Sequence, residues 1–320
     1  GSLKALFEVR DGDNLENFKG KVTKADSYSL TVENISIDNI KSLNLPDKDG
    51  KITVNNISYS YDSWEAQVDA QGNIKSVTFN LSKDKAIADP EKTVAEGYLL
   101  NAGSAINARG IPYYMTQLNE FVRNFSEMFN QIESKGQNLN GDTPPTFFEA
   151  ITNTAKVYDF SESEAYSKLP DGQTATINSS SNTYYRMTAA NFSVNKDVMN
   201  DVSLFATSTD YVKTDSCDIV DELKKLQSEK TVYRGDKAES FLETIISNVS
   251  VDTEKAETYN KLYSNLEQTI ANQRTSVSGV DEDEEALNLV KFQYSYNMAS
   301  KIISVMNQML DKLINDTGVA

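Results

Sequence analysis

The chain has 320 residues, a formal net charge of −16, no histidine and a single cysteine, Cys217. This charge argues against a nucleic-acid or anionic-membrane partner, and one cysteine excludes an intramolecular disulfide and a cysteine-rich metal site. Without histidine, and without the motifs GxxxxGK[ST], GxGxxG, GxSxG or HExxH, the sequence predicts a protein that is not an enzyme and has no catalytic, cofactor-binding or metal site.

The chain begins with a short predicted helix, from Leu3 to Asp11, assigned to residues 1–12. Residues 13–88 then alternate apolar and polar side chains, the pattern of half-buried strands. Turn-forming residues at 47–50 and 71–73 predict hairpins. We expect a separable antiparallel β domain here, inserted between helices. The alternating apolar runs are Tyr28/Leu30/Val32, Ile57/Tyr59/Tyr61, Trp64/Ala66/Val68 and Val77/Phe79/Leu81.

Residues 89–136 are assigned to helices of a stalk. The first of them is weakened by Gly97 and Gly103, but the second has a clear start, because Pro112 suits the first helical turn. Its apolar side chains follow the four-and-three spacing of one helix face, and Gly136 ends it. That face consists of Tyr114, Leu118, Phe121, Phe125, Met128 and Ile132.

Residues 137–191 return to short strands, predicted at 156–158, 175–177 and 184–185, and form a second β-rich lobe. Helices dominate residues 192–275, with segments at 219–227, 238–249 and 253–274. Nothing between the last two compels a break, so they are also compatible with one long rod. The predicted fold class is therefore α+β, an elongated stalk of long coiled-coil-like helices with two β-rich lobes inserted between them.

Residues 276–320 form the predicted C-terminal assembly helix. An acidic run, Asp281 to Glu285, lies where the positive end of the helix dipole favours carboxylates, and Gly318 is a plausible stop. An ordinary core helix would show the same apolar spacing. A second apolar row, Met298, Ile302, Val305 and Met309, lies beside the main one, and Ser300, Ser304, Asn307 and Asp311 occupy the polar side. The predicted interface consists of Leu289, Phe292, Tyr296, Ala299, Ile302, Ile303, Met306, Leu310 and Leu313.

Several passages resemble the flagellar axial proteins, the flagellin-like family, and most of all the hook-associated proteins of the hook–filament junction. The resemblance rests on SVSGV at 276–280, the acidic run that follows, and the pattern Leu289, Phe292-Gln293-Tyr294, Tyr296, Ala299, Lys301 and Ile302-Ile303. It covers residues 3–12 (LKALFEVRDG), 111–148, 192–208 and 274–314. The predicted β domain at 13–88 has no counterpart in it.

The resemblance implies a structural role, joining hook to filament by axial self-assembly through terminal helices that pack inside a tube. The implied partners are further copies of the chain in a ring or tube, the hook protein, and a second junction protein or flagellin. An export chaperone would bind the C-terminal helix. The implied location is extracellular, in the flagellum, after type III export, which agrees with an N-terminus that lacks a Sec-type signal. The family's N-terminal helices would precede Gly1.

The alternative from another class is a secreted surface adhesin or ligand-binding protein, or an acidic enzyme, that acts through its β-rich lobes. The two hypotheses differ in the part of the chain on which the function depends. A junction protein should associate through its terminal helices, whereas an adhesin should lose binding when a lobe is deleted.

Overall fold

The computed structural model describes residues 2–47, 49–83, 86, 87, 90, 94, 96–212, 216–228, 231–233 and 235–315. The chain divides into two compact units, Gly1–Ile246 and Ser247–Ala320. The predicted mixture of α and β structure with a long C-terminal helical segment is confirmed. Among the described residues, no helix is both long and apolar enough to cross a membrane. The predicted stop at Gly318 lies outside the described residues.

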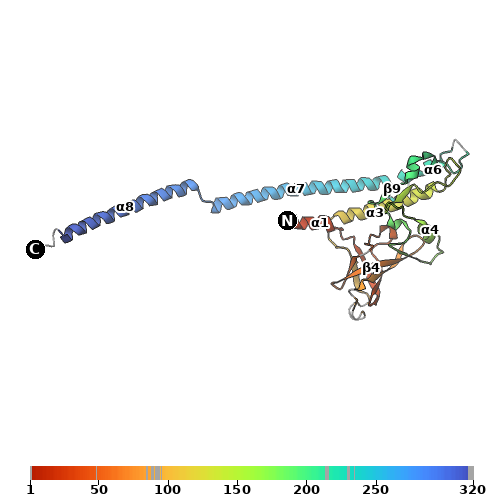
Figure 1. Cartoon of the computed structure of the whole chain (residues 1–320), viewed down its shortest axis with the longest axis horizontal. Coiled ribbons are helices and arrows are strands. Elements are labelled where there is room, and N and C mark those ends of the chain that lie inside the picture. Colours follow the sequence, from red (N-terminus) through yellow and green to blue (C-terminus); the bar gives the residue numbers. More distant parts are fainter. Residues whose placement is uncertain are drawn as a thin grey trace. The chain divides into compact units, whose positions relative to one another are not determined.

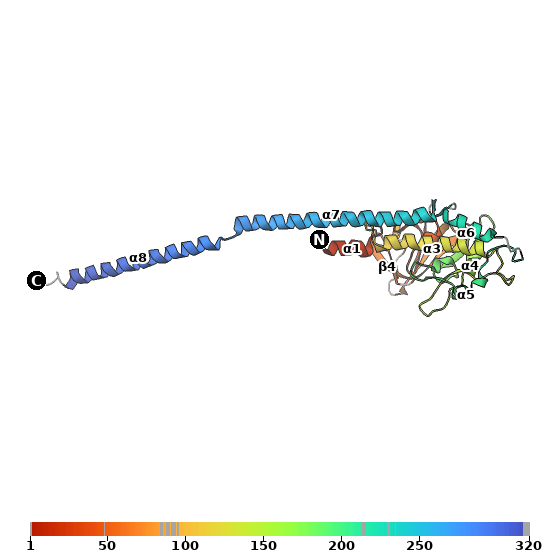
Figure 2. The ribbon, with the colours of Figure 1, turned by 90° about the horizontal axis from the view of Figure 1, so that it is seen from above.

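Two helices of unit 1 follow each other end to end. α1 spans Ser2–Asp11 and α3 spans Ile111–Glu133. In Figures 1 and 2, α1 (red) and α3 (yellow) lie end to end. Both helices were predicted. The predicted apolar face of α3 packs against apolar side chains from later in the chain. Its central part contacts Ile219 and Leu226, and its first half contacts Phe241 and Ile245.

The strands between α1 and α3 form a closed antiparallel sheet. Its order is β3-β6-β1-β2-β5-β4, and a further β3–β4 pairing closes it. The predicted alternation is confirmed except at Tyr28 and Ile57, which are exposed. The other side chains that alternate inward fill one apolar core, in which Leu30, Trp64 and Phe79 have no exposed surface. The strands are β1 (Phe18–Asp26), β2 (Ser29–Glu33), β3 (Gly50–Val54), β4 (Ile57–Val68), β5 (Ile74–Leu81) and β6 (Leu99–Ala102), with a 3-10 turn, η1, at Ile40–Ser42.

A β-bulge in β4 explains why its inward side chains change parity. Tyr59 and Tyr61 point into the core at odd positions, whereas Trp64 and Ala66 point in at even ones. The pairing of β4 with β5 shifts register between Tyr61 and Ser63. The extra residue of the bulge shifts the alternation by one position, so that the even-numbered side chains in the second half of the strand point into the core.

Two sequence expectations in this region differ from the structure, and a third is confirmed. Residues 99–102, assigned to a stalk helix, form β6, which pairs with both β1 and β3 and so closes the sheet beyond residue 88. The turn at 71–73 is a hairpin turn, with Gly72 at φ +77°. The predicted hairpin turn at 47–50 is wrong, because Gly50 already belongs to β3 and the β3–β4 hairpin turns at Asn55 and Asn56, whose φ values are 50° and 62°. Asparagine tolerates this left-handed region better than most residues, which makes it a common hairpin residue. Lys48 lies outside the described residues.

The second predicted β-rich lobe is not a single separate sheet, although Ala150, Tyr184 and Met187 form a small apolar cluster in this region. β8 (Ala175–Asn178) pairs with β4, so it extends the first sheet, and Tyr166, Ile177 and Tyr185 belong to the first core. The remaining pair, β7 (Phe148–Ala150) and β9 (Phe192–Val194), is a short antiparallel ladder against α3. Residues 184–186 form a 3-10 turn, η3, and not the predicted strand. α4 (Ser161–Ser167), α5 (Lys196–Asn200) and η4 (Val202–Leu204) complete this region.

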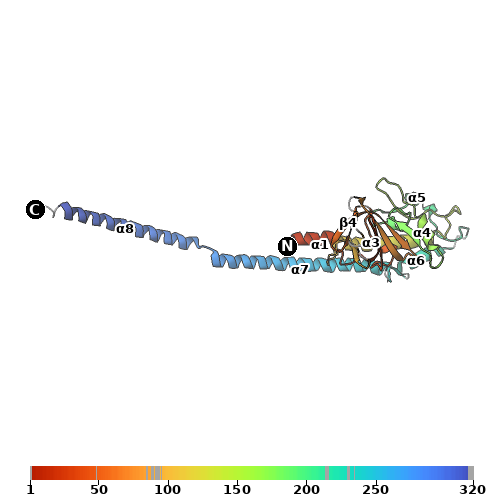
Figure 3. The same cartoon turned by 90° about the horizontal axis from the view of Figure 1, so that it is seen from below.

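Helices dominate the rest of the chain, as predicted. Figure 3 shows α4, α5 and α6 at the end of unit 1 away from α1. α7 is one continuous helix, so the two predicted segments at 238–249 and 253–274 are a single rod. Only its first turns belong to unit 1, where Phe241 and Ile245 are buried. These elements are α6 (Asp218–Ser228), β10 (Thr231–Tyr233), β11 (Asp236–Lys237), α7 (Ala238–Ser278) and α8 (Glu282–Asn315).

Candidate assembly interface

The predicted interface residues all lie on one helix, α8, in unit 2. None of them is buried: Phe292 has 76% of its surface exposed, and Leu310, the least exposed of the large ones, has 52%. Successive residues of an α-helix advance by about 100°, so the four-and-three spacing places Phe292, Ile303 and Leu310 along a single line. The remaining members of the face are Leu289, Tyr296, Ala299, Ile302, Met306 and Leu313.

The acidic run begins this helix, as the sequence predicts. The side-chain oxygen Oδ1 of Asp281 accepts hydrogen bonds from the backbone N–H groups of Asp283 at 3.0 Å and Glu284 at 3.3 Å. These are donors that the first turn of a helix leaves without partners. Glu282 to Glu285 occupy that first turn, where carboxylates interact favourably with the helix dipole. The run is thus explained as a helix cap.

The apolar face has no cover within its own unit. Among the described residues of unit 2, none is buried, so its helices have no core of their own. Met298, Ile302, Val305 and Met309 widen the face, and fully burying a side chain of this size contributes roughly 1.5–3 kcal/mol. A helix with so wide an exposed apolar face is typical of a protein–protein interface.

The exposed face extends beyond the residues that the sequence predicted for the interface. On α7, Leu262, Leu266 and Ile270 are each about half exposed, and Tyr259 and Tyr263 accompany them. The spacing of Tyr259, Leu262, Leu266 and Ile270 was visible in the sequence, where it was assigned to the stalk. The same four-and-three spacing as on α8 was the signal that could have placed these residues in the interface.

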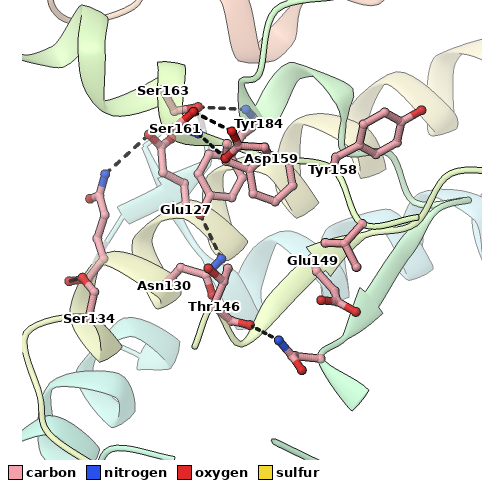
Figure 4. A pocket seen from close by; sticks show the side chains of 14 residues that line it. Glu127, Asn130, Ser134, Thr146, Glu149, Tyr158, Asp159, Ser161, Ser163 and Tyr184 are labelled. Carbon is pink, nitrogen blue, oxygen red and sulfur yellow. Dashed lines mark hydrogen bonds between the residues drawn. The ribbon is translucent and has the colours of Figure 1, made fainter. Parts of the chain in front are cut away.

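Unit 1 offers a different kind of candidate site, a polar cavity of about 370 Å³ beside the C-terminal half of α3. Figure 4 shows that its polar side chains bond mainly to one another and to nearby backbone. Glu149, from β7, is buried, and burial together with Asp197 raises the pKa of its carboxyl group. The carboxylate of Asp159 accepts both the N–H and the hydroxyl of Ser161, which lowers the pKa of Asp159.

The hydroxyl groups that line this cavity are poorly placed for nucleophilic chemistry. A carboxylate with a lowered pKa is a weak base, and Ser161 and Asp159 form the turn that begins α4. The oxygen of Ser163 accepts the backbone N–H of Tyr184 at 2.9 Å. Within the described part of the chain there is also no group of acidic, histidine or cysteine side chains that could hold a metal ion.

Comparison with known proteins shows similarity to flagellar proteins. Residues 271–316 match the family model described as "Flagellar basal body rod FlgEFG protein C-terminal", which covers the end of α7 and the whole of α8. Over 215 residues the chain is 24% identical to flagellar hook-associated protein 1 of Bacillus subtilis (strain 168). That match covers 65% of this chain and 36% of the relative, so the chain spans little more than a third of the relative's length.

These matches confirm the resemblance to the hook-associated proteins and support a structural role in the flagellum. They also agree with the geometry, because the segment recognised by the flagellar family model is the one whose apolar face is uncovered. Which of its side chains make contacts in an assembly stays a prediction.

Proposed function

We propose that this chain is part of a structural protein that joins hook to filament in the bacterial flagellum, and that it assembles axially through α8. The observation that carries the proposal is the double apolar row of α8, which is exposed along its whole length. Exposed apolar surface of this extent is costly in water and is removed when copies pack together. The flagellar matches supply the kind of assembly.

The proposed partners follow from this role. Copies of the chain form a ring or tube with the face of α8 turned inward, and the neighbouring components are the hook protein and a second junction protein or flagellin. An export chaperone covers the same apolar face before assembly, since an exposed face of this size would otherwise aggregate. The proposed location is outside the cell, in the flagellum, reached by type III export.

The test uses one substitution on the apolar face and one beside it. Ile303→Asp in the full-length protein places a carboxylate in the proposed interface, where burying it without a partner costs several kcal/mol. Filaments should then fail to attach to hooks while the protein is still made and exported, and flagellin monomers should be found in the medium. The attached filaments are counted by electron microscopy.

Ser304→Asp is the matched control, because Ser304 lies on the polar side of the same helical turn. It should leave filament attachment nearly unchanged. Normal filaments with Ile303→Asp would overturn the proposal. Equal damage from both substitutions would show that α8 is enclosed on all sides, so that the polar side assigned here is also packed.

A further inference from the structure

A second cavity in unit 1, of about 340 Å³, is lined by two arginines in a chain with a formal net charge of −16. Arg123 comes from the middle of α3, and Arg186 comes from η3. Tyr158 and Tyr185 supply aromatic walls. The sole carboxylate among its lining residues is that of Asp47, an exposed residue.

Arg123 is a buried cation whose partners are mostly neutral. Only 2% of its surface is exposed. Its Nε donates to the carbonyl oxygen of Met187 at 2.9 Å, and its Nη1 donates to the carbonyl oxygens of Lys41 and Leu43 at 2.8 and 2.7 Å. The guanidinium lies over the ring of Tyr185, with its Cζ 4.5 Å from the ring centroid. Carbonyl and ring contacts orient the charge but do not neutralise it.

The guanidinium also retains donors that these contacts do not use. A guanidinium has five N–H groups in a planar fork, and within the described part of the chain Nη2 makes no hydrogen bond and no carboxylate forms an ion pair with Arg123. Burial lowers the pKa of Arg123 to about 10, so the group is still charged at neutral pH. The carboxylates of Glu120 and Asp47 act on this charge electrostatically but form no ion pair with it in the described chain, so burial still dominates its pKa. A buried charge without an ion-pair partner is costly, and a bound anion would reduce that cost.

Arg186 provides the second positive charge on the same cavity. Its Cζ lies 4.0 Å from the ring centroid of Tyr158, and its Nη1 donates to the carbonyl oxygen of Ser180 at 3.3 Å. The stacking on Tyr158 holds the planar fork in place, and no carboxylate in the described chain forms an ion pair with this guanidinium. Ser179 and Thr188 add hydroxyl groups to the wall.

We propose that this cavity binds an oxyanion, the carboxylate or phosphate group of a small molecule, between Arg123 and Arg186. Guanidinium groups recognise both kinds of oxyanion through paired N–H···O bonds, and these are stronger than bonds between neutral groups. The site lies in the part of the chain that the axial role of α8 does not use. It therefore adds a ligand-binding function that can fail without affecting the proposed assembly.

The test is a titration of the purified whole chain with inorganic phosphate and, separately, with citrate, at constant ionic strength maintained with sodium chloride. Nitrogen-15 NMR of the arginine side chains follows the Nε–H of Arg123, which its bond to Met187 protects from exchange. A saturable shift with phosphate or with citrate is expected, and the stronger response identifies which oxyanion the cavity prefers.

Arg186→Gln should weaken that binding by about tenfold or more, because a hydrogen bond to a charged group contributes roughly 1.5–3 kcal/mol and 1.4 kcal/mol is a factor of ten. Arg274→Gln, the same substitution at an exposed position of α7, should leave it unchanged. Asp47→Asn should strengthen binding by removing a like charge. A response to chloride alone, the absence of saturation, or equal weakening in both arginine variants would overturn the proposal.

Discussion

The backbone N–H of Gly110 donates to the carbonyl oxygen of Gly12 at 3.1 Å, and neither residue has room for a side chain. A Cβ on Gly12 would lie 2.3 Å from the carbonyl oxygen of Glu8, and a Cβ on Gly110 would lie 2.4 Å from the same atom. This contact joins the end of α1 to the start of α3. It also brings together the two ends of the segment that carries the closed sheet.

The first prediction concerns this contact. Gly110→Ala should lower the free energy of unfolding by about 1–3 kcal/mol or more, because the added methyl group meets backbone atoms that cannot move aside independently. Urea unfolding followed by circular dichroism measures the change. Gly172→Ala is the control: its φ of +81° is unfavourable for alanine, but nothing lies within 4 Å of the added Cβ. An effect of Gly110→Ala no larger than that of the control would show that the contact is loose.

The second prediction tests whether the closed sheet and the region after α3 unfold together. Ile177 in β8 is 3% exposed and belongs to the core of the closed sheet, so Ile177→Ala should cost roughly 2–5 kcal/mol. Trp64, the single tryptophan, is fully buried with its ring 4.9 Å from that of Tyr185, and its fluorescence reports on this core. The midpoint of its urea transition should fall.

Gln173→Ala, at an exposed turn position just before β8, is the matched control and should change the midpoint little. The sequence predicted a separable domain at 13–88, so a deletion that joins Gly12 to Arg109 and removes residues 13–108 would have had little effect on the helices. The shared core makes us expect the opposite, because such a deletion leaves β8 and Tyr166 without their partners. A Trp64 transition unaffected by Ile177→Ala would restore the idea of a separable domain.

The third prediction concerns Glu133, near the end of α3. Its side chain is 1% exposed, and the backbone of Ala206 lowers the pKa of its carboxyl group by less than burial raises it. Burial raises its pKa from 4.5 to about 7. The folded protein therefore holds this proton more tightly than the unfolded chain does. Stability should fall by about 2–3 kcal/mol as the pH rises from about 4.5 to about 7.

Glu133→Gln removes the titrating group, so this part of the pH dependence should disappear. Urea midpoints measured at the two ends of the window test this directly. Glu243→Gln, at an exposed position of α7, is the matched control, and its stability should still fall as the pH rises. A fall of the same size in Glu133→Gln would assign the pH dependence to another group.

The fourth prediction concerns α8 before assembly. In a verified monomer, the amides from Phe292 to Leu313 should exchange with solvent quickly, because a helix without tertiary contacts opens easily. Amides of the closed sheet should exchange slowly. Assembly should slow exchange along α8. Strong protection of α8 in the monomer would mean that its apolar face is covered within the chain itself.

The sequence by itself determined the features that depend on local periodicity. Alternation through Leu30, Val32, Phe79 and their neighbours identified strands, because every second side chain of a strand points into the core. Four-and-three spacing identified α3 and the exposed face of α8 for the corresponding reason in helices. The missing histidine and the acidic cap at Asp281 also needed no tertiary information.

Only the tertiary structure decided which distant segments meet. β6 lies between Gly97 and Gly103 and is four residues long, too short to show a period. Its pairing with β1 and β3 is what makes it a strand. Arg123 lies on the side of α3 opposite its apolar seam, where a helix pattern predicts solvent. It is buried because carbonyl groups of Lys41, Leu43 and Met187, far away in the chain, converge on it. A buried polar side chain is stable only where such partners surround it, and no local pattern encodes partners that lie more than sixty residues away.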